Sequence, residues 1–600
     1  MNTAEASAIA LASRELLTQG DAEGAERLLA PVLKTLKTDA EALHLMGLIK
    51  KARNQLEEAE RHFRSAVAHA LGEGAYYNDL GVVLQARGNY AEAVRIYRAA
   101  IALRPEVTMV RINLVQCLLA SGEIAEAERE ARTCVHAEPN AETWTLLSQV
   151  HRRQEKFEES LNDALAALQC GPKFRGLRYN YANALERIGR IKEALDIYES
   201  LAKKDLDSAD LAHNYARTLY AEGRKKEAEA VIEQALELWP ASHPLYSTLA
   251  RMRFLRGEGE NSTAPLEDAW ANRPSDIGLR LVIADSLHRA GLRERARDTL
   301  EHAIRMAPDT PALLSAYGIV MDELNQPEEG LKALRRVAEL APQSRSAQRN
   351  LLSTLLRAGR PDEALHIVGA LRQEDQDEQY LIACEAVALR MTGDAFYPTI
   401  CDYDRFVRTY EIAPPRGYFT AENFNTSLAD VLRAQHRGVN PLDYQIPNGS
   451  QTNRNLLHSP DPAIKGFLNA VEGAVRDYIS RLKAEPHHPF LRRTRERFRF
   501  QGLWSARVQK DGYLPNHVHD RGWISSAYYV AIMPPERPKD VRNGWLKFGE
   551  PNKAPSNCGP EKWLEPKLGQ LVLFPSYMWH GTSAFEGPER LSAAFDIVPS

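Results

Sequence analysis

Three histidines near the C-terminal end have the side-chain type and spacing of metal ligands. His517 and His519 lie two residues apart in GYLPNHVHDRGW, and His580 follows in FPSYMWHGT. Residues two apart in an extended segment point to the same side, so both imidazoles of the pair can face one interior point. Two close ligands and one distant histidine have the arrangement of a facial triad, which leaves half of an octahedral iron open.

A basic and a hydroxyl side chain follow the third histidine. Arg590 and Ser592 lie in ERLSAAF, which has the pattern of the next strand along the chain. A guanidinium that a strand holds in place can bind a carboxylate through two parallel hydrogen bonds. The sequence therefore predicts an anion-binding group one strand beyond the candidate metal ligands.

Short aromatic and β-branched runs carry all of these residues. From residue 498 onward the chain contains RFQGLWSARVQK, WISSAYYVAIM, GWLKFGE, LGQLVLFPSYM and RLSAAFDIV, separated by Gly, Pro and Asn turns. This pattern predicts a β-sandwich or barrel. A helical pattern over 462–483 precedes it, so we expect flanking helices.

The first two thirds of the chain repeat themselves with a period of 34 residues. Prolines recur in this phase, and small residues are followed four positions later by larger apolar ones. The prolines are Pro105, Pro139, Pro172, Pro240, Pro274, Pro308 and Pro342, and small–large pairs include Ala59–Phe63, Ala93–Tyr97, Ala194–Tyr198 and Gly330–Leu334. Small residues let two helices approach closely, and each proline ends a helix. One helix pair cannot bury its apolar face, so neighbouring pairs must stack into a superhelix.

This pattern resembles the tetratricopeptide repeat (TPR), in about ten copies over 37–372 with degenerate helices before them. The C-terminal region resembles the 2-oxoglutarate and Fe(II) oxygenases that accompany such repeats in bacterial proteins. The matching segments are WSARV, GYLPNHVH, GWISSAYYV, GWLKFGEP, LVLFPSYMWHGT and RLSAAFDIVP. We therefore predict a multidomain chain with an α-helical TPR superhelix over 1–375 and an oxygenase-like domain over 376–600. The resemblance implies that the second domain is a double-stranded β-helix, a distorted jelly roll with flanking helices.

The same resemblance implies a role for each candidate residue. His517, His519 and His580 would bind Fe(II), and Arg590 with Ser592 would hold the cosubstrate 2-oxoglutarate. Tyr528 and Tyr529 are adjacent in a predicted strand, so one ring belongs to the core and the other can border the cosubstrate. Tyr528 is our candidate for that contact. No catalytic group beyond the metal centre is required.

The second ligand position leaves a choice open. The wider superfamily usually has HxD at this site, whereas the chain has His517-Val518-His519. Three histidines can still bind Fe(II), but the loss of a carboxylate changes the charge of the site and its affinity. Asp520 would replace His519 if the strand bulges there. The remaining alternative is a site with two ligands only.

Composition excludes several classes of protein. The 76 basic and 80 acidic residues give a net charge of −4, which does not favour a nucleic-acid or membrane partner. No apolar run approaches the ~18–20 residues of a membrane span. The six cysteines are scattered without a CxxC pair, so we expect a cytoplasmic protein without disulfides.

These expectations combine into one function. We expect an Fe(II)- and 2-oxoglutarate-dependent dioxygenase that uses O₂ to hydroxylate a peptide or protein bound in the concave TPR surface. One alternative is a non-catalytic TPR scaffold with a ligand-binding jelly roll. Another is a small-molecule oxygenase whose repeats recruit a biosynthetic partner. The sequence makes no prediction of the oligomeric state.

Overall fold

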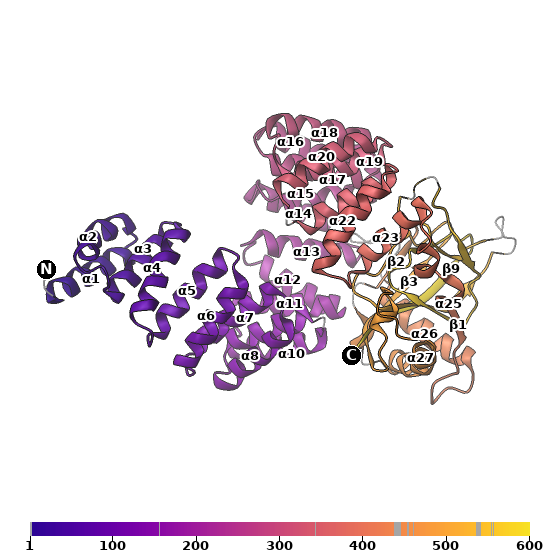
Figure 1. The fold of residues 1–600 in the computed structure, drawn as a ribbon, viewed down its shortest axis with the longest axis horizontal. Helices are drawn as coiled ribbons and strands as arrows, with labels where there is room; N and C mark the ends of the chain where they lie inside the picture. The colour runs from indigo at the N-terminus through magenta and orange to yellow at the C-terminus, as the bar shows by residue number, and fades with distance from the viewer. Residues whose placement is uncertain are drawn as a thin grey trace. The chain divides into compact units, whose positions relative to one another are not determined.

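The computed structural model describes residues 3–154, 156–342, 344–436, 446–452, 455–459, 461–535, 542–553, 555 and 557–600. The chain divides into two units, Met1–Ile197 and Tyr198–Ser600. The described residues of the first unit contain helices and no strand, whereas the second unit contains further helices followed by a β-sheet domain (Figure 1). The prediction of a helical TPR region followed by an antiparallel β domain is confirmed.

Consecutive helices in the first unit form antiparallel pairs. They are α1 (Thr3–Thr18), α2 (Ala22–Thr35), α3 (Ala40–Ala52), α4 (Leu56–His69), α5 (Gly74–Ala86), α6 (Tyr90–Leu103), α7 (Thr108–Ser121), α8 (Ile124–Ala137), α9 (Ala141–Arg153), α10 (Phe157–Cys170), α11 (Arg175–Ile188) and α12 (Ile191–Ala202), the last of which crosses into the second unit. Pro105 and Pro139 each follow the end of a second helix by two residues, as their missing N–H groups require.

Glycines in the first helix of a pair receive the large residues of the second helix. A Cβ atom on Gly81 would lie 2.6 Å from the ring of Tyr97, and one on Gly47 would lie 2.6 Å from the ring of Phe63. Both rings are fully buried. The 34-residue pattern therefore depends on the absence of a side chain at these glycines as well as on the small residues of the second helix.

We expect Gly81→Ala to lower the stability of the first unit by about 1–3 kcal/mol, because the new methyl group must displace a packed ring. The midpoint of thermal or urea unfolding measures this change. Gly176→Ala in α11 is the matched control, since no atom lies within 4 Å of its Cβ position. Equal midpoints for Gly81→Ala and the wild type would contradict this packing argument.

The second unit continues the helix pairs. They are α13 (Ala209–Ala221), α14 (Lys225–Leu238), α15 (His243–Arg253), α16 (Ala264–Ala271), α17 (Ile277–Arg289), α18 (Arg293–Met306), α19 (Pro311–Glu323), α20 (Pro327–Leu340), α21 (Arg345–Arg357), α22 (Pro361–Glu374) and α23 (Gln379–Thr392). A π-helical turn over Phe254–Glu258 and a 3₁₀ turn over Gly259–Thr263 interrupt the pair formed by α15 and α16. Since α22 ends at Glu374 and the first strand begins at Arg408, the domain boundary at 375 stays a prediction.

Two antiparallel sheets form the β domain. One has the strand order β1-β7-β4-β9-β3-β2 and the other has the order β6-β5-β8. The strands are β1 (Arg408–Glu411), β2 (Gly449–Gln451), β3 (Phe498–Val508), β4 (Ile524–Met533), β5 (Leu546–Phe548), β6 (Lys562–Leu564), β7 (Gln570–Pro575), β8 (His580–Thr582) and β9 (Glu589–Pro599). Short helices α24 (Tyr397–Ile400) and α25 (Tyr403–Phe406) precede β1, and α26 (Ala421–Gln435) and α27 (Pro462–Ser480) supply the flanking helices.

Helix α27 covers one face of the larger sheet. The ring of Phe467 lies 5.0 Å from that of Tyr528 on β4 and 6.1 Å from that of Phe595 on β9, measured between centroids. All three side chains are buried in the main core of the domain. The polar residues of the candidate site must therefore lie on the other face of β4 and β9.

The last repeats pack directly on the β domain within the second unit. Cys558 is buried among leucines of α20–α23, and Arg390 of α23 donates to the carbonyls of Gly549 and Gly559, both at 2.9 Å. Arg349 of α21 forms an ion pair with Asp520 at 2.7 Å. No helix in the described parts of the chain has the length and apolarity to cross a bilayer.

Candidate metal centre

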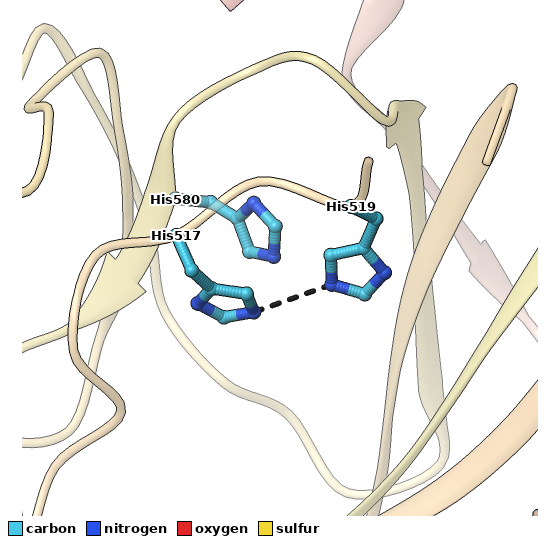
Figure 2. Close-up of side chains that lie close together, drawn as sticks. All are labelled: His517, His519 and His580. Atoms are coloured by element: carbon cyan, nitrogen blue, oxygen red, sulfur yellow. Dashed lines mark hydrogen bonds between the residues drawn. The ribbon is translucent and has the colours of Figure 1, made fainter. Parts of the chain in front are cut away.

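The structure brings the three predicted histidines together. The candidate ligand atoms of His517, His519 and His580 all lie within 4.8 Å of one another, and the Nε2 atoms of His517 and His519 are 3.2 Å apart. Figure 2 shows the three rings around one point. Among the described residues this is the one group of His, Cys and carboxylate side chains with such spacing.

Backbone pairing fixes the two chain segments that carry these rings. The amide of His517 donates to the carbonyl of His580 at 2.8 Å, and the amide of His580 donates back at 3.1 Å. The amide of His519 donates to the carbonyl of Ser576 at 3.0 Å. The short strand β8 therefore sets the distance between the paired histidines and the distant one.

The Nδ1 atom of each ring has an acceptor that orients it. His517 donates to the carbonyl of Pro515 at 2.8 Å, and His580 donates to that of Met578 at 2.9 Å. His519 donates to the carboxylate of Asp596, at 2.6 and 2.8 Å to its two oxygens. Because carbonyl and carboxylate oxygens only accept, each Nδ1 carries the proton and each Nε2 is directed to the centre as a potential ligand.

Burial and neighbouring charge set the protonation of the cluster. Burial, assisted by the charge of His519, lowers the pKa of His517 to about 4. Burial also holds the pKa of His580 well below its usual value. Burial lowers the pKa of His519 as well, but the charge and hydrogen bond of Asp596 outweigh it and the net direction is upward. Two neutral imidazoles and a third paired with a carboxylate are a donor set that fits ferrous iron.

Asp520 lies outside this group. Its carboxylate pairs with Arg349 of α21, and about two fifths of its side chain is exposed. His519 is the residue of this segment that points toward the other two histidines, so the arrangement supports neither Asp520 nor a two-ligand site.

Arg590 is fully buried on β9, and within the described residues its hydrogen bonds go to neutral oxygens. Its guanidinium donates to the carbonyl of Gly544 and, at 3.1 Å, to the hydroxyl of Thr582. Thr582 lies two residues beyond His580 on β8, which places the guanidinium beside the histidine cluster. Burial lowers the pKa of Arg590, and no described carboxylate contributes to the shift. Because a buried cation with neutral partners is costly, an anion that binds beside it would offset that cost, so Arg590 is a candidate anion-binding group.

The other two predicted cosubstrate residues differ in placement. Ser592 lies two residues beyond Arg590 on β9 and therefore faces the same side. Tyr528 is not brought to the site, because its hydroxyl donates to Asn425 of α26 at 2.6 Å on the helix-covered face. Its neighbour Tyr529 pairs in register with Ser592. Burial raises the pKa of Tyr529 to about 12 while the charge of Arg590 opposes the shift, so Tyr529 is the ring beside the guanidinium.

Sequence reasoning missed the polar residues that support His519. Asp596 accepts from His519 and from Ser525 of β4, and Ser525 shares a further hydrogen bond of 2.8 Å with Ser576. Asp596 lies an even number of residues beyond Arg590, hence on the same face of one strand. The alternation of side chains along this strand could therefore have predicted, from the sequence, that Asp596 faces the same side as Arg590.

Comparison with protein families agrees with this geometry. A family described as "Putative 2OG-Fe(II) oxygenase" matches residues 502–596, a segment that contains the three histidines, Arg590 and Asp596. Two tetratricopeptide-repeat families match residues 44–108, 84–150, 189–252 and 322–378. The oxygenase family implies Fe(II) and 2-oxoglutarate and suggests an oxidoreductase, and the repeats suggest protein binding.

Several solved repeat proteins are similar to part of the chain. MamA from Desulfovibrio magneticus RS-1 is 20% identical over 28% of this chain and 97% of that chain, with a TM-score of 0.27. PilF from Pseudomonas aeruginosa is 17% identical over 34% and 94%, with a TM-score of 0.31. YrrB, described as a TPR protein with an unusual peptide-binding site, is 17% identical over 30% and 95%, with a TM-score of 0.26. No curated protein matches the chain. The chain carries tetratricopeptide repeats within residues 44–378, followed near its C-terminus by a domain of the 2OG-Fe(II) oxygenase family.

Proposed function

We propose that the chain is an Fe(II)- and 2-oxoglutarate-dependent dioxygenase that hydroxylates a peptide or protein bound by its repeats. One observation carries the proposal: three imidazoles converge beside a buried guanidinium whose described partners are all neutral. A metal cation and a dianionic cosubstrate are the ligands that these two features fit together.

Each part of the site has a task in this reaction. His517, His519 and His580 hold the iron, and Arg590 binds the far carboxylate of 2-oxoglutarate with Ser592 beside it. When bound, iron and its cosubstrate supply the oxidising chemistry, in which one atom of O₂ enters succinate and the other enters the substrate as CO₂ leaves. The surrounding strands exclude water and orient the reactants, so no further acid or base is needed.

A cavity among the repeats supports a peptide as the bound partner. It has a volume of about 370 Å³ and lies between α13, α15 and α17, the first helices of three successive pairs. Arg217, Arg251 and Arg289 line it together with the ring of Phe254. Side chains of this kind can bind both the acidic and the apolar groups of an extended segment. The predicted cytoplasmic location belongs to the same proposal.

Succinate formation and protein mass test the two halves of the proposal together. Metal-free protein captures binding proteins from a lysate, and Fe(II), 2-oxoglutarate and air are then added. We expect succinate release and a captured protein whose mass increases by one oxygen atom only when 2-oxoglutarate is present. Succinate release that requires a small molecule and leaves every captured protein unchanged would favour the small-molecule oxygenase. Failure to bind 2-oxoglutarate and to form succinate would favour the scaffold.

A further inference from the structure

We propose that Asp596 is a positioning residue that supplies, through His519, the negative charge that a carboxylate ligand contributes in other facial triads. This inference rests on the proposed function, because it concerns the metal that the three histidines would hold. A triad of two histidines and one carboxylate lowers the charge of bound Fe(II) by one unit. Three neutral histidines do not, so the chain needs an anion elsewhere to reach the same charge.

Asp596 is the anion in direct contact with the cluster. Both of its oxygens lie within 2.8 Å of Nδ1 of His519, and the shorter distance of 2.6 Å is below the usual length of such a bond. His517 and His580 instead donate to backbone carbonyls, which are neutral. Among the described residues, His519 is thus the one ring of the three with an anionic hydrogen-bond partner, and it occupies the position where a carboxylate ligand is usual.

The surroundings hold the carboxylate in place. Asp596 is 5% exposed, and Ser525 donates to its Oδ1 atom at 2.7 Å. A Cβ atom on Gly522 would lie 2.2 Å from the hydroxyl of Ser576 and 3.4 Å from the carboxyl carbon of Asp596, so a glycine is needed for this close packing. His519 forms the only ion pair of Asp596 within the described parts of the chain. Burial of an anion is costly, and a cation bound to His519 would offset that cost.

The imidazole of His519 connects the negative charge of Asp596 to the candidate metal centre. Nδ1 of His519 donates to Asp596, and its Nε2 atom points toward the other histidines, as Figure 2 shows. A carboxylate on Nδ1 fixes the orientation of the imidazole and makes Nε2 a stronger electron donor. Asp596 therefore acts on the metal without touching it.

Metal affinity tests this role without any need for turnover. We expect Asp596→Asn to weaken the binding of Mn²⁺ alone by about 10–100-fold, measured by calorimetry on the full chain. The amide keeps the size and the acceptor oxygen but loses the charge. Ser526→Ala is the matched control, because this buried neighbour of Ser525 bonds to the backbone of Phe595 instead of the site.

A double-mutant cycle separates this role from a merely structural one. In a His519→Asp background a carboxylate ligand is restored, so Asp596→Asn should there weaken Mn²⁺ binding less than about threefold. An equal loss in both backgrounds would overturn the inference, as would unchanged affinity in Asp596→Asn. If His519→Asp does not fold, the Mn²⁺ affinity of the single variant Asp596→Asn tests the inference. Wild-type protein that binds no Mn²⁺ would reject the proposed function and this inference together, whereas tight wild-type binding with an unaffected Asp596→Asn variant rejects the inference alone.

Discussion

Replacing His580 by alanine is expected to abolish succinate formation, with a rate at least about a hundredfold below that of the wild type. Loss of a partner that only orients a ligand already costs about 10–100-fold in metal affinity or activity, and loss of the ligand itself must cost more. The backbone bonds between residues 517 and 580 do not involve the side chain, so the strand pairing should survive. Succinate measured against time at saturating Fe(II) and 2-oxoglutarate gives the rate.

The control for this variant is His487→Ala. His487 is an exposed histidine of the same domain, and its replacement should leave turnover unchanged. The circular dichroism spectrum and the unfolding midpoint of both variants show whether the fold is retained. Undiminished turnover in folded His580→Ala would reject iron chemistry at this cluster.

Arg590→Met is expected to raise the KM for 2-oxoglutarate by about a hundredfold or more. Hydrogen bonds to charged groups contribute about 1.5–3 kcal/mol each, and every 1.4 kcal/mol is a factor of ten. Binding of Mn²⁺ alone should change less than twofold, because Arg590 donates to Gly544 and Thr582 and not to the histidines. Calorimetric titration of 2-oxoglutarate into the Mn²⁺-loaded protein separates the two effects.

The same substitution should leave the unfolding midpoint of the ligand-free protein unchanged or raise it. A buried charge with neutral partners is costly, and an apolar side chain of similar length removes that cost. Arg433→Met provides the contrast, because Arg433 pairs with the buried carboxylate of Glu589 at 2.7 Å. We expect it to lower the midpoint and leave the KM for 2-oxoglutarate unaltered. A normal KM in Arg590→Met would show that the cosubstrate carboxylate binds elsewhere.

The sequence was sufficient for the features that depend on local spacing. A 34-residue period determines which helices pair, and alternation along an extended segment places His517 beside His519. The sequence was insufficient where the position of a side chain depends on a partner far away in the chain. Asp520 turns away because Arg349, 171 residues earlier, holds it, and no local pattern encodes that contact.

Tyr528 illustrates a second reason why the sequence did not predict the position of every site residue. Alternation required that one tyrosine of the pair face the core, but it could not say which side of the sheet the helices would cover. Asn425 and Phe467 of the flanking helices decide this, and they leave Tyr529 on the side of the guanidinium. The contact of Asp596 with the site could not be predicted for the first reason, since its partner His519 is 77 residues earlier in the chain.

The contact between the last repeats and the β domain limits how the chain can be divided into fragments. Asp520, which directly follows the candidate ligand His519, forms an ion pair with Arg349. Trp579, which directly precedes His580, contacts the ring of Tyr380 edge-on at 6.2 Å between centroids. The guanidinium of Arg349 also lies over the ring of Tyr380 at 4.1 Å, so the two contacts are connected. The last helices of the array thus contact the segments that carry two of the candidate ligands, and a fragment beginning at residue 376 would lack Arg349 and the leucines of α20–α22 that pack in the cluster around Cys558.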